Sequence, residues 1–502
     1  MTNPLYDQLF GKYASAETVF LHLPNGSALT HGAFVAMASR FASALSGCGA
    51  EPGDRVAVQV EKSAECLAIY AACAQAGLIF LPLNTAYTAE EVRYFVEDSG
   101  ARVFICDGAK ADALRPVADG AGARLETLNA NGTGSLPDMA AGMAVDFATA
   151  NRAEDDLAAF LYTSGTTGRS KGAMLTQKNL LSNAHTLTGL WQFTNRDVLL
   201  HALPIFHTHG LFVATNVMLL AGGAMIFQPK FDVDAMILAL PKATSMMGVP
   251  TFYTRLLDDA RFDRDLIAGM RLFISGSAPL LAETHVAFET RTGLRILERY
   301  GMTETNMNTS NPCDGERRAG TVGPPLPDVE LRVMGESGPV PAGEIGTIEV
   351  RGPNVFKGYW NMPEKTAEEL RQDGWFITGD LGFQAEDGYV TIVGRGKDLI
   401  ISGGYNIYPK EVEEVIDDTP GVLESAVVAA PHPDMGEAAV AFIVPQSAGQ
   451  IDVAVVEARL KDQLARFKHP RKLMIVDALP RNTMGKVQKN LLRDQVAGLF
   501  RG

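Results

Sequence analysis

The 502-residue sequence is poor in cysteine, and its few cysteines do not form the pattern of a disulfide framework or a zinc site. There are five, an odd number, and no Cys-x-x-Cys pair occurs. Cys66 and Cys73 lie seven residues apart in an apolar pattern, which predicts that both lie on the inner face of one helix. We therefore expect buried, reduced thiols, as is typical of cytosolic proteins.

A secretory leader and a membrane span are also missing from the pattern. Residues 1–7 carry an acid where a signal peptide has a basic segment followed by an apolar one. The longest stretch without Asp, Glu, Lys or Arg, residues 198–229, is interrupted by Pro204, histidines and glycines, so it is interpreted as buried core. We expect a cytoplasmic protein that does not bind membranes.

Positive charge is in deficit, because 58 acidic and 44 basic residues give a formal net charge of −14. A negative average surface repels polyanions, which argues against broad nucleic-acid binding. The C-terminal part departs from this average with a basic cluster, which is either a solvated face or a site for phosphate groups: Arg466, Lys468, Arg471, Lys472, Arg481, Lys486, Lys489 and Arg493.

What the chain does contain is a repeated strand–helix pattern. Residues 55–60 alternate as a strand, Ser63 is placed to cap a helix that runs to about Ala76, and residues 79–83 form another apolar strand. Further strands are expected at 102–106, 158–161, 224–227 and 272–274. This pattern predicts an α/β fold of parallel sheets covered by helices, in a chain too long for one core.

The pattern changes toward the C-terminus. Short strands between glycine and proline turns, such as residues 346–350, predict a β-rich subdomain over about 325–394 of a large N-terminal domain, 1–394. The polar segment 395–398 is predicted to be a boundary, or hinge. Strands at 424–429 and 438–444, and a helix with Val456, Leu460, Leu464 and Phe467 on one face, predict a small α+β domain over 399–502.

The stretch from Tyr162 to Ala173 has the composition of a phosphate-binding loop. Hydroxyl residues, glycines and a lysine follow a predicted strand, so amides, hydroxyls and an ammonium can approach a polyphosphate closely. The spacing is not that of the Walker loop. Residues 168–172 also match Gly-x-Ser-x-Gly, but the strand-like residues after Ser170 disfavour a hydrolase nucleophile there.

Five motifs, in this order, resemble those of the adenylate-forming superfamily of acyl-CoA synthetases, luciferases and adenylation domains. They are the loop at 162–173, Arg299–Glu304, Thr378–Asp380, Gly394–Asp398 and Pro480–Lys486. The resemblance spans essentially the whole chain. Within the superfamily, residues 201–209, 247–255 and 298–312 are most similar to malonyl-CoA synthetases.

The resemblance implies an ATP site with Mg²⁺ as a cofactor. Glu304, next to Thr303, corresponds to the Mg²⁺ ligand, Asp380 and Arg395 to ribose contacts, and Lys486 to the lysine that reaches the α-phosphate. The full set implied for ATP is Thr163, Ser164, Gly165, Thr166, Thr167, Gly168, Lys171, Ser277, Ala278, Pro279, Glu298, Arg299, Tyr300, Gly301, Met302, Thr303, Asp380, Arg395 and Lys486. For Ser277 and Tyr300 a purely structural role is the alternative.

The resemblance also implies a CoA site and a moving C-terminal lid domain. The family rotates this domain about a hinge that corresponds to Lys397, and the place where CoA enters corresponds to Ser402, Gly403, Gly404 and Tyr405. In related synthetases the lysine that matches Lys486 is acetylated, so a lysine acetyltransferase is an expected partner.

The acid to be activated is expected to be malonate, whose second carboxylate needs a cationic partner when buried. Arg255 is the candidate, with an exposed helix arginine as the alternative reading. His207, Thr208, Ser277 and Met302 are candidate pocket residues. His207 is also a candidate catalytic residue, together with Lys486, Glu304 and Thr303, and packing behind the site is its alternative role. The expected enzyme is an AMP-forming malonate:CoA ligase, with methylmalonate as a further possible substrate.

Other functions are less compatible with these residues. The alternative that stays open is a synthetase for another short-chain acid, because it would share the ATP and CoA motifs. An adenylation module that feeds a carrier is disfavoured because the chain ends soon after Lys486, and a catalytically silent nucleotide-binding protein would lack Lys486 and Glu304.

Overall fold

The computed structural model describes residues 2–163, 170–402, 405–433, 435–446, 451–464, 466–482 and 485–500. The chain forms two compact units. Unit 1 comprises residues 1–319, 323–330 and 350–376, and unit 2 comprises residues 320–322, 331–349 and 377–502. Among the described residues, no helix is long and apolar enough to cross a membrane.

Unit 1 contains a six-stranded sheet in the order β6-β5-β3-β4-β7-β8, parallel except for β8. Its strands are β3 (Arg55–Gln59), β4 (Ile79–Pro82), β5 (Val103–Cys106), β6 (Arg124–Thr127), β7 (Leu157–Thr163) and β8 (Lys171–Thr176). Neighbouring helices are α2 (His31–Gly47), α3 (Ala64–Ala76), α4 (Ala89–Ser99), α5 (Ala111–Ala121) and α6 (Ser135–Ala141), with the 3₁₀ turn η2 (Gly108–Lys110).

Helix α3 begins where the sequence predicts. The Ser63 side chain accepts a hydrogen bond from the Cys66 amide, and Gly77 ends the helix in a left-handed conformation. Cys66 and Cys73 lie on this helix and are buried as predicted, and every other residue of α3 except Glu65 is buried as well. The thiols of Cys66 and Cys73 are reduced and buried, and burial raises their pKa values.

The second sheet of unit 1 has the order β14-β13-β12-β11-β9-β10-β1-β2, with antiparallel strands only at its two edges. Its strands are β1 (Val19–His22), β2 (Ala28–Thr30), β9 (Val198–His201), β10 (Ala224–Phe227), β11 (Ser245–Gly248), β12 (Leu272–Ser275), β13 (Leu297–Met302) and β14 (Asn306–Ser310). All the strands predicted from the sequence in unit 1 are therefore present.

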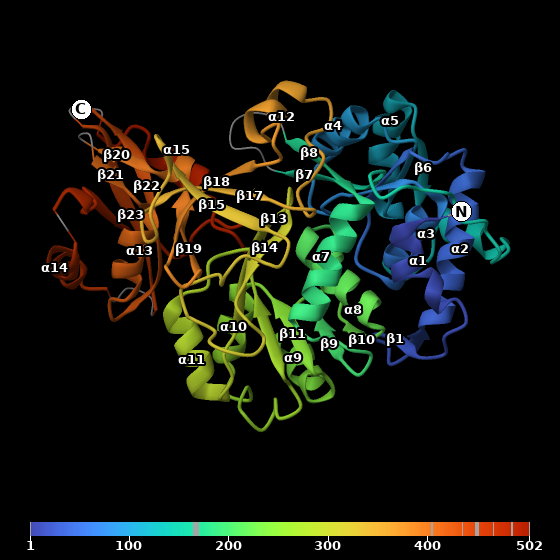
Figure 1. Cartoon of the computed structure of the whole chain (residues 1–502), viewed down its shortest axis with the longest axis horizontal. Coiled ribbons are helices and arrows are strands. Elements are labelled where there is room, and N and C mark those ends of the chain that lie inside the picture. Colours follow the sequence, from blue (N-terminus) through green and yellow to red (C-terminus); the bar gives the residue numbers. More distant parts are fainter. Residues whose placement is uncertain are drawn as a thin grey trace. The chain divides into compact units, whose positions relative to one another are not determined.

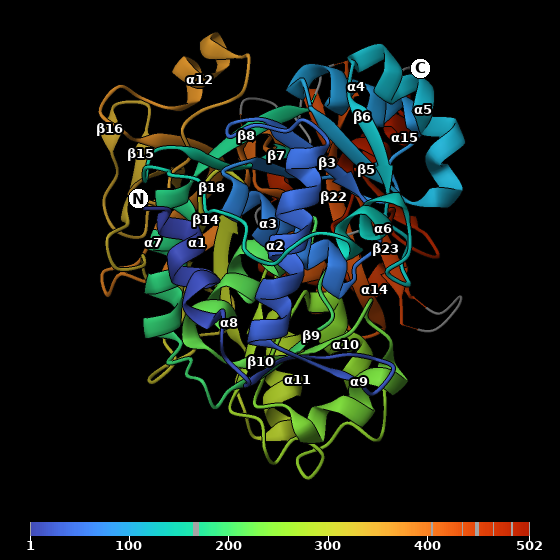
Figure 2. The ribbon, with the colours of Figure 1, turned by 90° about the vertical axis from the view of Figure 1, so that its right-hand side faces the viewer.

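Helices cover this sheet on both sides. Figure 1 shows α9 (Val233–Ala239), α10 (Pro250–Leu257) and α11 (Ala282–Thr292) beside β9 to β12, and their side chains share one apolar core with these strands. Figure 2 shows α1 (Pro4–Leu9), α7 (Gln177–Leu190) and α8 (Asn216–Ala221) grouped together. The remaining elements of unit 1 are α12 (Pro363–Glu369), the π-helix η3 (His209–Thr215) and the 3₁₀ turns η1 (Gly11–Tyr13) and η4 (Leu240–Lys242).

Unit 2 contains two five-stranded sheets. The first has the order β16-β15-β17-β18-β19 and is the predicted β-rich segment, with a few end residues in unit 1: β15 (Glu330–Gly335), β16 (Gly338–Pro339), β17 (Gly346–Arg351), β18 (Phe376–Gln384) and β19 (Val390–Arg395). Contacts group this sheet with the C-terminal residues, so the predicted domain boundary at 395 stays a prediction.

The second sheet comprises β20 (Ile400–Ser402), β21 (Tyr405–Ile407), β22 (Val422–His432), β23 (Gly436–Pro445) and β24 (Lys472–Ile475). Its neighbours are α13 (Pro409–Asp417), α14 (Val453–Gln463), α15 (Lys489–Val496) and the 3₁₀ turns η5 (Gly396–Asp398) and η6 (Arg466–Lys468). The predicted helix was too long, because α14 ends at Gln463 and Leu464 is extended. Leu464 and Phe467 still pack against the core, since their apolar spacing serves a turn as well as a helix.

The basic C-terminal cluster is largely occupied by ion pairs inside unit 2. The pairs are Lys468–Glu411, Arg481–Glu424, Lys489–Glu413 and Arg493–Asp398. Their acceptors are carboxylates on α13, β22 and η5. These pairs involve four of the eight cations of the cluster and reduce its charge, and the choice between a solvated face and a phosphate site stays a prediction.

Candidate functional site

The parallel strands of the eight-stranded sheet bring several predicted residues to one edge. Ligands of α/β sheets characteristically bind beyond the carboxyl ends of parallel strands. Three segments start at this edge, after β9, after β12 and at the end of β13. They carry His207 and Thr208; Ser277, Ala278 and Pro279; and Arg299, Tyr300, Gly301, Met302, Thr303 and Glu304.

The loop after β12 is strained at a predicted site residue. Ser277 has φ of 72°, in the left-handed region that a non-glycine residue adopts only at a cost of about 1–3 kcal/mol. Its hydroxyl lies 3.1 Å from Nδ1 of His209. Ser277 and Pro279 are exposed and Ala278 is half-buried.

Arg299 is the most unusual charged group at this edge. Its side chain is only 3% exposed, and within the described part of the chain its Nε and Nη2 atoms have no hydrogen-bond partner. Burial lowers the guanidinium pKa to about 10, so the group stays charged at neutral pH. An unpaired buried cation costs several kcal/mol, and a bound anion would remove that cost.

Gly276 and His209 surround this guanidinium. A Cβ atom on Gly276 would lie 2.3 Å from Cζ of Arg299, so the arginine packs directly against the glycine backbone. His209 is buried, and burial followed by the charge of Arg299 lowers its pKa well below the usual value. Its Nε2 also has no partner among the described residues. The neutral His209 imidazole therefore lies close enough to the charged Arg299 guanidinium for that charge to affect its pKa.

The other predicted acyl-pocket residues have less distinctive environments. His207 is half-buried, and burial lowers its pKa to about 4, so it is neutral at pH 7. Thr208 is buried and Met302 is half-buried. Arg255 lies in the last turn of α10 with its side chain exposed. The structure thus buries Arg299, not Arg255, at the strand ends.

Glu304 belongs to a network of charged and hydroxyl groups in unit 1. The Tyr359 hydroxyl lies 3.0 Å from Oε1 of Glu304 and 2.6 Å from Oε2 of Glu369. Lys171, the first residue of β8, donates to both carboxylate oxygens of Glu369 at 3.1 Å and to Tyr359 at 3.2 Å. Burial and the two carboxylates strongly raise the Tyr359 pKa, so it remains a neutral donor.

The chemistry of Glu304 fits a hard divalent cation. Its carboxylate is 5% exposed and offers only oxygen ligands. Within the described residues, no three His, Cys, Asp or Glu side chains form a metal cluster. Magnesium at nucleotide sites typically takes one or two carboxylates and completes its shell with phosphates and water, so a single carboxylate is compatible with it.

Part of the predicted phosphate loop and CoA site lies outside the described residues. This applies to Ser164, Gly165, Thr166, Thr167, Gly168, Gly403 and Gly404, and to the side chain of Tyr405. The described ends of the loop are Thr163, which terminates β7, and Ser170, whose carbonyl accepts a hydrogen bond from Tyr94 at 2.8 Å. Strand β8 starts directly after Ser170, so no helix follows it and the hydrolase elbow is excluded.

Unit 2 carries the remaining predicted ATP-site residues. Asp380 and Arg395 are paired across β18 and β19, with Arg395 Nε 2.7 Å from the Asp380 carboxylate. Lys486 has an exposed side chain; desolvation of its ammonium and then the charge of Arg395 lower its pKa, opposed by Asp380 and Asp398. Lys486 therefore lies in the electrostatic field of the Asp380–Arg395 pair.

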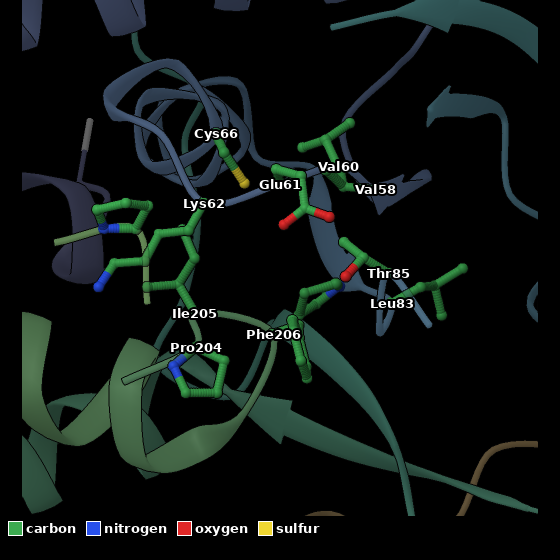
Figure 3. Close-up of a pocket in the computed structure, with 12 residues that line it drawn as sticks. Val58, Val60, Glu61, Lys62, Cys66, Leu83, Thr85, Pro204, Ile205 and Phe206 are labelled. Carbon is green, nitrogen blue, oxygen red and sulfur yellow. The ribbon is translucent and has the colours of Figure 1, made fainter. Parts of the chain in front are cut away.

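A small pocket that sequence reasoning missed lies between the segment after β3 and the loop after β9 (Figure 3). The Lys62 ammonium donates to Nδ1 and to the carbonyl oxygen of His201, both at 2.8 Å. Since His201 Nε2 lies 2.9 Å from the Gly210 carbonyl, Nε2 carries the proton and Nδ1 accepts. Burial lowers the pKa of Lys62 well below its usual value, and no sequence motif signals this burial.

The sequence likewise did not predict the environments of four further residues, which are Arg299, His209, Tyr359 and Glu369. Arg299 was assigned to the nucleotide because it stands in the motif that ends at Glu304. The signal that was available is the His-x-His spacing of 207 and 209, which places two imidazoles beside one strand end. Glu369 and Tyr359 are more than 180 residues from Lys171 along the chain, so no local pattern connects them.

Comparisons with known proteins show the family of the chain. The model of the family "AMP-binding enzyme" matches residues 11–360, and that of the "AMP-binding enzyme C-terminal domain" matches residues 411–486. A crystal structure of ATP-bound MatB from Rhodopseudomonas palustris is 55% identical, with a TM-score of 0.98 and full coverage of both chains.

Two curated relatives have CoA-ligase names. A "Malonate--CoA ligase" of Arabidopsis thaliana is 35% identical over 480 residues, which cover 89% of this chain and 79% of the relative. A "Feruloyl-CoA synthase" of Amycolatopsis sp is 36% identical over 474 residues, covering 93% and 94%. On the extent of these matches, and in agreement with the resemblance of its motifs, the chain belongs to the AMP-binding enzymes of the adenylate-forming superfamily.

Proposed function

We propose that this protein is an ATP-dependent malonate:CoA ligase that forms malonyl-CoA, AMP and pyrophosphate through malonyl-adenylate. Membership of the AMP-binding enzymes supports the ATP-dependent step, and the relative named malonate–CoA ligase supports the acid. The observation that carries the choice of malonate is the buried guanidinium of Arg299, whose Nε and Nη2 have no hydrogen-bond partner among the described residues, together with the neighbouring His209.

Malonate needs such a group because one carboxylate reacts and the other must remain charged in the pocket. A planar guanidinium binds a carboxylate through two parallel hydrogen bonds, and Nε and Nη2 of Arg299 are the atoms without partners among the described residues. Arg255 is exposed and carries no comparable desolvation cost. We therefore assign the second carboxylate to Arg299 in place of Arg255, with His207, Thr208, Ser277 and Met302 as further lining residues.

The reaction has two steps. In the first, a malonate oxygen attacks the α-phosphorus of ATP, a P–O bond forms and pyrophosphate leaves. In the second, the CoA sulfur attacks the carbonyl carbon, a C–S bond forms, AMP leaves with the electrons of the C–O bond, and the thiol proton is lost to solvent or a base.

In this proposal, residues from several segments of the chain hold the nucleotide. Thr163, Lys171 and the loop between them, Ser164 to Gly168, bind the polyphosphate. Asp380 and Arg395 bind the ribose hydroxyls, and Lys486 neutralises charge at the α-phosphate. Ser277, Ala278, Pro279, Glu298, Tyr300, Gly301 and Thr303 surround the adenine and the phosphates.

Glu304 would hold Mg²⁺ through its carboxylate. When bound, the cation neutralises negative charge on the phosphate oxygens. For the second step, Ser402, Gly403, Gly404 and Tyr405 are proposed to accept the pantetheine chain, and Lys397 to be the hinge. Acetylation of Lys486 by an acetyltransferase, use of methylmalonate and the cytoplasmic location stay predictions.

ATP-dependent pyrophosphate release over a panel of acids, with and without CoA, tests the function. We expect malonate to be preferred over butyrate and ferulate, because a monocarboxylate leaves Arg299 unpaired. Release that is fastest with ferulate would favour the activity that the Amycolatopsis relative is named for. If pyrophosphate were released at the same rate with every acid, the proposed preference for malonate would be wrong.

Two matched variants test the assignment of the second carboxylate. In Arg299→Leu, malonate kcat/KM should fall by on the order of 10²-fold or more, since a buried charge pair is lost, while butyrate activity is kept. Arg255→Leu is the control, and its ratio of malonate to butyrate activity should match that of the unaltered enzyme. The reverse result would return the role to Arg255.

A further inference from the structure

Glu369 holds the phosphate-loop lysine of unit 1 in a fully occupied arrangement. An ammonium has three N–H donors. Those of Lys171 face Oε1 and Oε2 of Glu369, each at 3.1 Å, and the Tyr359 hydroxyl at 3.2 Å. The Lys171 ammonium also lies over the Tyr359 ring, 4.2 Å from its centroid. To donate to a phosphate oxygen, Lys171 must therefore give up at least one of these partners.

The carboxylate is well placed to survive that loss. Lys365, one turn earlier on α12, lies 3.0 Å from Oε1 of Glu369, and the Tyr359 hydroxyl lies 2.6 Å from Oε2. Release of Lys171 thus leaves Glu369 with a cation and a hydroxyl donor. Burial opposes its charge, but the hydrogen bonds from Tyr359 and Lys365 and the charge of Lys171 together keep its pKa below the usual value.

We propose that the Glu369 carboxylate competes with the polyphosphate of ATP for the Lys171 ammonium, so that binding of the nucleotide exchanges one anionic partner of the lysine for another. This inference rests on the proposed function, because it takes Lys171 as a ligand of the polyphosphate. Glu369 is then a positioning residue that sets the affinity for nucleoside triphosphate without contacting it. Breaking the contact with Glu369 offsets part of the attraction between Lys171 and the phosphates. When no nucleotide is bound, the contact with Glu369 keeps the lysine ordered.

Glu369→Gln removes the competing charge and keeps the shape of the side chain. Glu368→Gln is the matched control, because Glu368 is one residue away on α12 and is paired with Lys365. The dissociation constants of ATP and of AMP are measured by calorimetry on the full chain without malonate or CoA. Glu369→Gln should bind ATP about fivefold more tightly, the scale of a partly exposed ion pair, and AMP unchanged because it lacks the β- and γ-phosphates.

A double-mutant comparison separates exchange at Lys171 from simple repulsion between Glu369 and the phosphates. In a Lys171→Met background, Glu369→Gln should leave the ATP affinity unchanged. Equal tightening in both backgrounds, or unchanged or weaker ATP binding by Glu369→Gln alone, would overturn the exchange. Thermal unfolding of each variant checks that it is folded. An unaltered protein that binds neither nucleotide would instead contradict the proposed function, and the exchange with it.

Discussion

At the scale of single residues, burial separates groups that sequence motifs treat alike. Arg255 and Arg299 both stand in motifs typical of the family, yet one is exposed and the other is 3% exposed without partners for two of its nitrogens among the described residues. The cost of burying a charge depends on its surroundings in three dimensions, which a linear pattern does not contain. The sequence therefore predicted that an arginine is needed, but the difference in burial between Arg255 and Arg299 was not predictable from it.

Lys486 presents the opposite case, where the motif is more informative than the environment. Its side chain is exposed and looks like an ordinary member of a basic segment. Its position at the end of the Pro480–Lys486 motif singles it out, whereas the charges around it, Arg395 opposed by Asp380 and Asp398, do not.

Removal of the Lys486 charge should slow adenylate formation. We expect Lys486→Ala to lower ATP-dependent pyrophosphate release by at least about 10²-fold, the usual scale for a lost electrostatic stabiliser of a transition state. Lys472→Ala, a change to an exposed lysine on β24, is the control and should retain the rate of the unaltered enzyme. Equal rates for Lys486→Ala and the unaltered enzyme would remove Lys486 from the first step.

At the scale of elements, the strand ends of the eight-stranded sheet decide which side chains meet. Strands β12 and β13 are parallel neighbours with Ser275 opposite Glu298, so the loop after β12 lies directly beside Arg299. The sequence predicted two strands of this sheet, β10 and β12, because buried parallel strands leave a short apolar run as a local signal. The order of the strands was not predictable, because pairing is a property of the whole sheet.

The contact between Gly276 and Arg299 has a measurable consequence. In Gly276→Ala, the new Cβ would lie 2.3 Å from Cζ of Arg299, so the guanidinium must move. We expect the catalytic efficiency with malonate to fall by on the order of 10²-fold, the effect of misplacing a positioning group by about 1 Å, with unchanged ATP affinity.

Gly269→Ala is the matched control for this change. The nearest atom to its Cβ would be 3.7 Å away, an ordinary contact, so malonate activity should be unaffected. If Gly276→Ala weakened ATP binding and malonate use equally, the loop after β12 would act on the nucleotide and not on the acid.

At the scale of the whole molecule, the sequence and the contacts divide the chain differently. The sequence places the β-rich segment in the N-terminal domain, whereas contacts assign most of its sheet to unit 2. The polar, glycine-containing segment 395–398 still marks the place where two sheets of unit 2 are joined, by the 3₁₀ turn η5. A short connection of this kind can act as a hinge without loss of either sheet.

Restriction of this connection should affect the two steps unequally. In Lys397→Pro, the fixed φ angle limits rotation of the backbone, and we expect one half-reaction to be kept while the other slows. Pyrophosphate release from ATP and malonate measures the first step, and thioester formation from supplied malonyl-adenylate measures the second. An equal loss in both would argue against a hinge at this residue.

Much of this protein could be known before its structure was seen. Local physics was sufficient for part of the strands, among them β3, β4, β5 and β7, and for the Ser63 cap of α3 and the buried thiols, since hydrophobic periodicity and capping act over a few residues. The ordered motifs were sufficient for the family. The tertiary structure decided that Arg299 is the desolvated guanidinium and that Glu369 and Tyr359 occupy Lys171. These facts depend on contacts between segments far apart in the chain, and only folding brings such segments together.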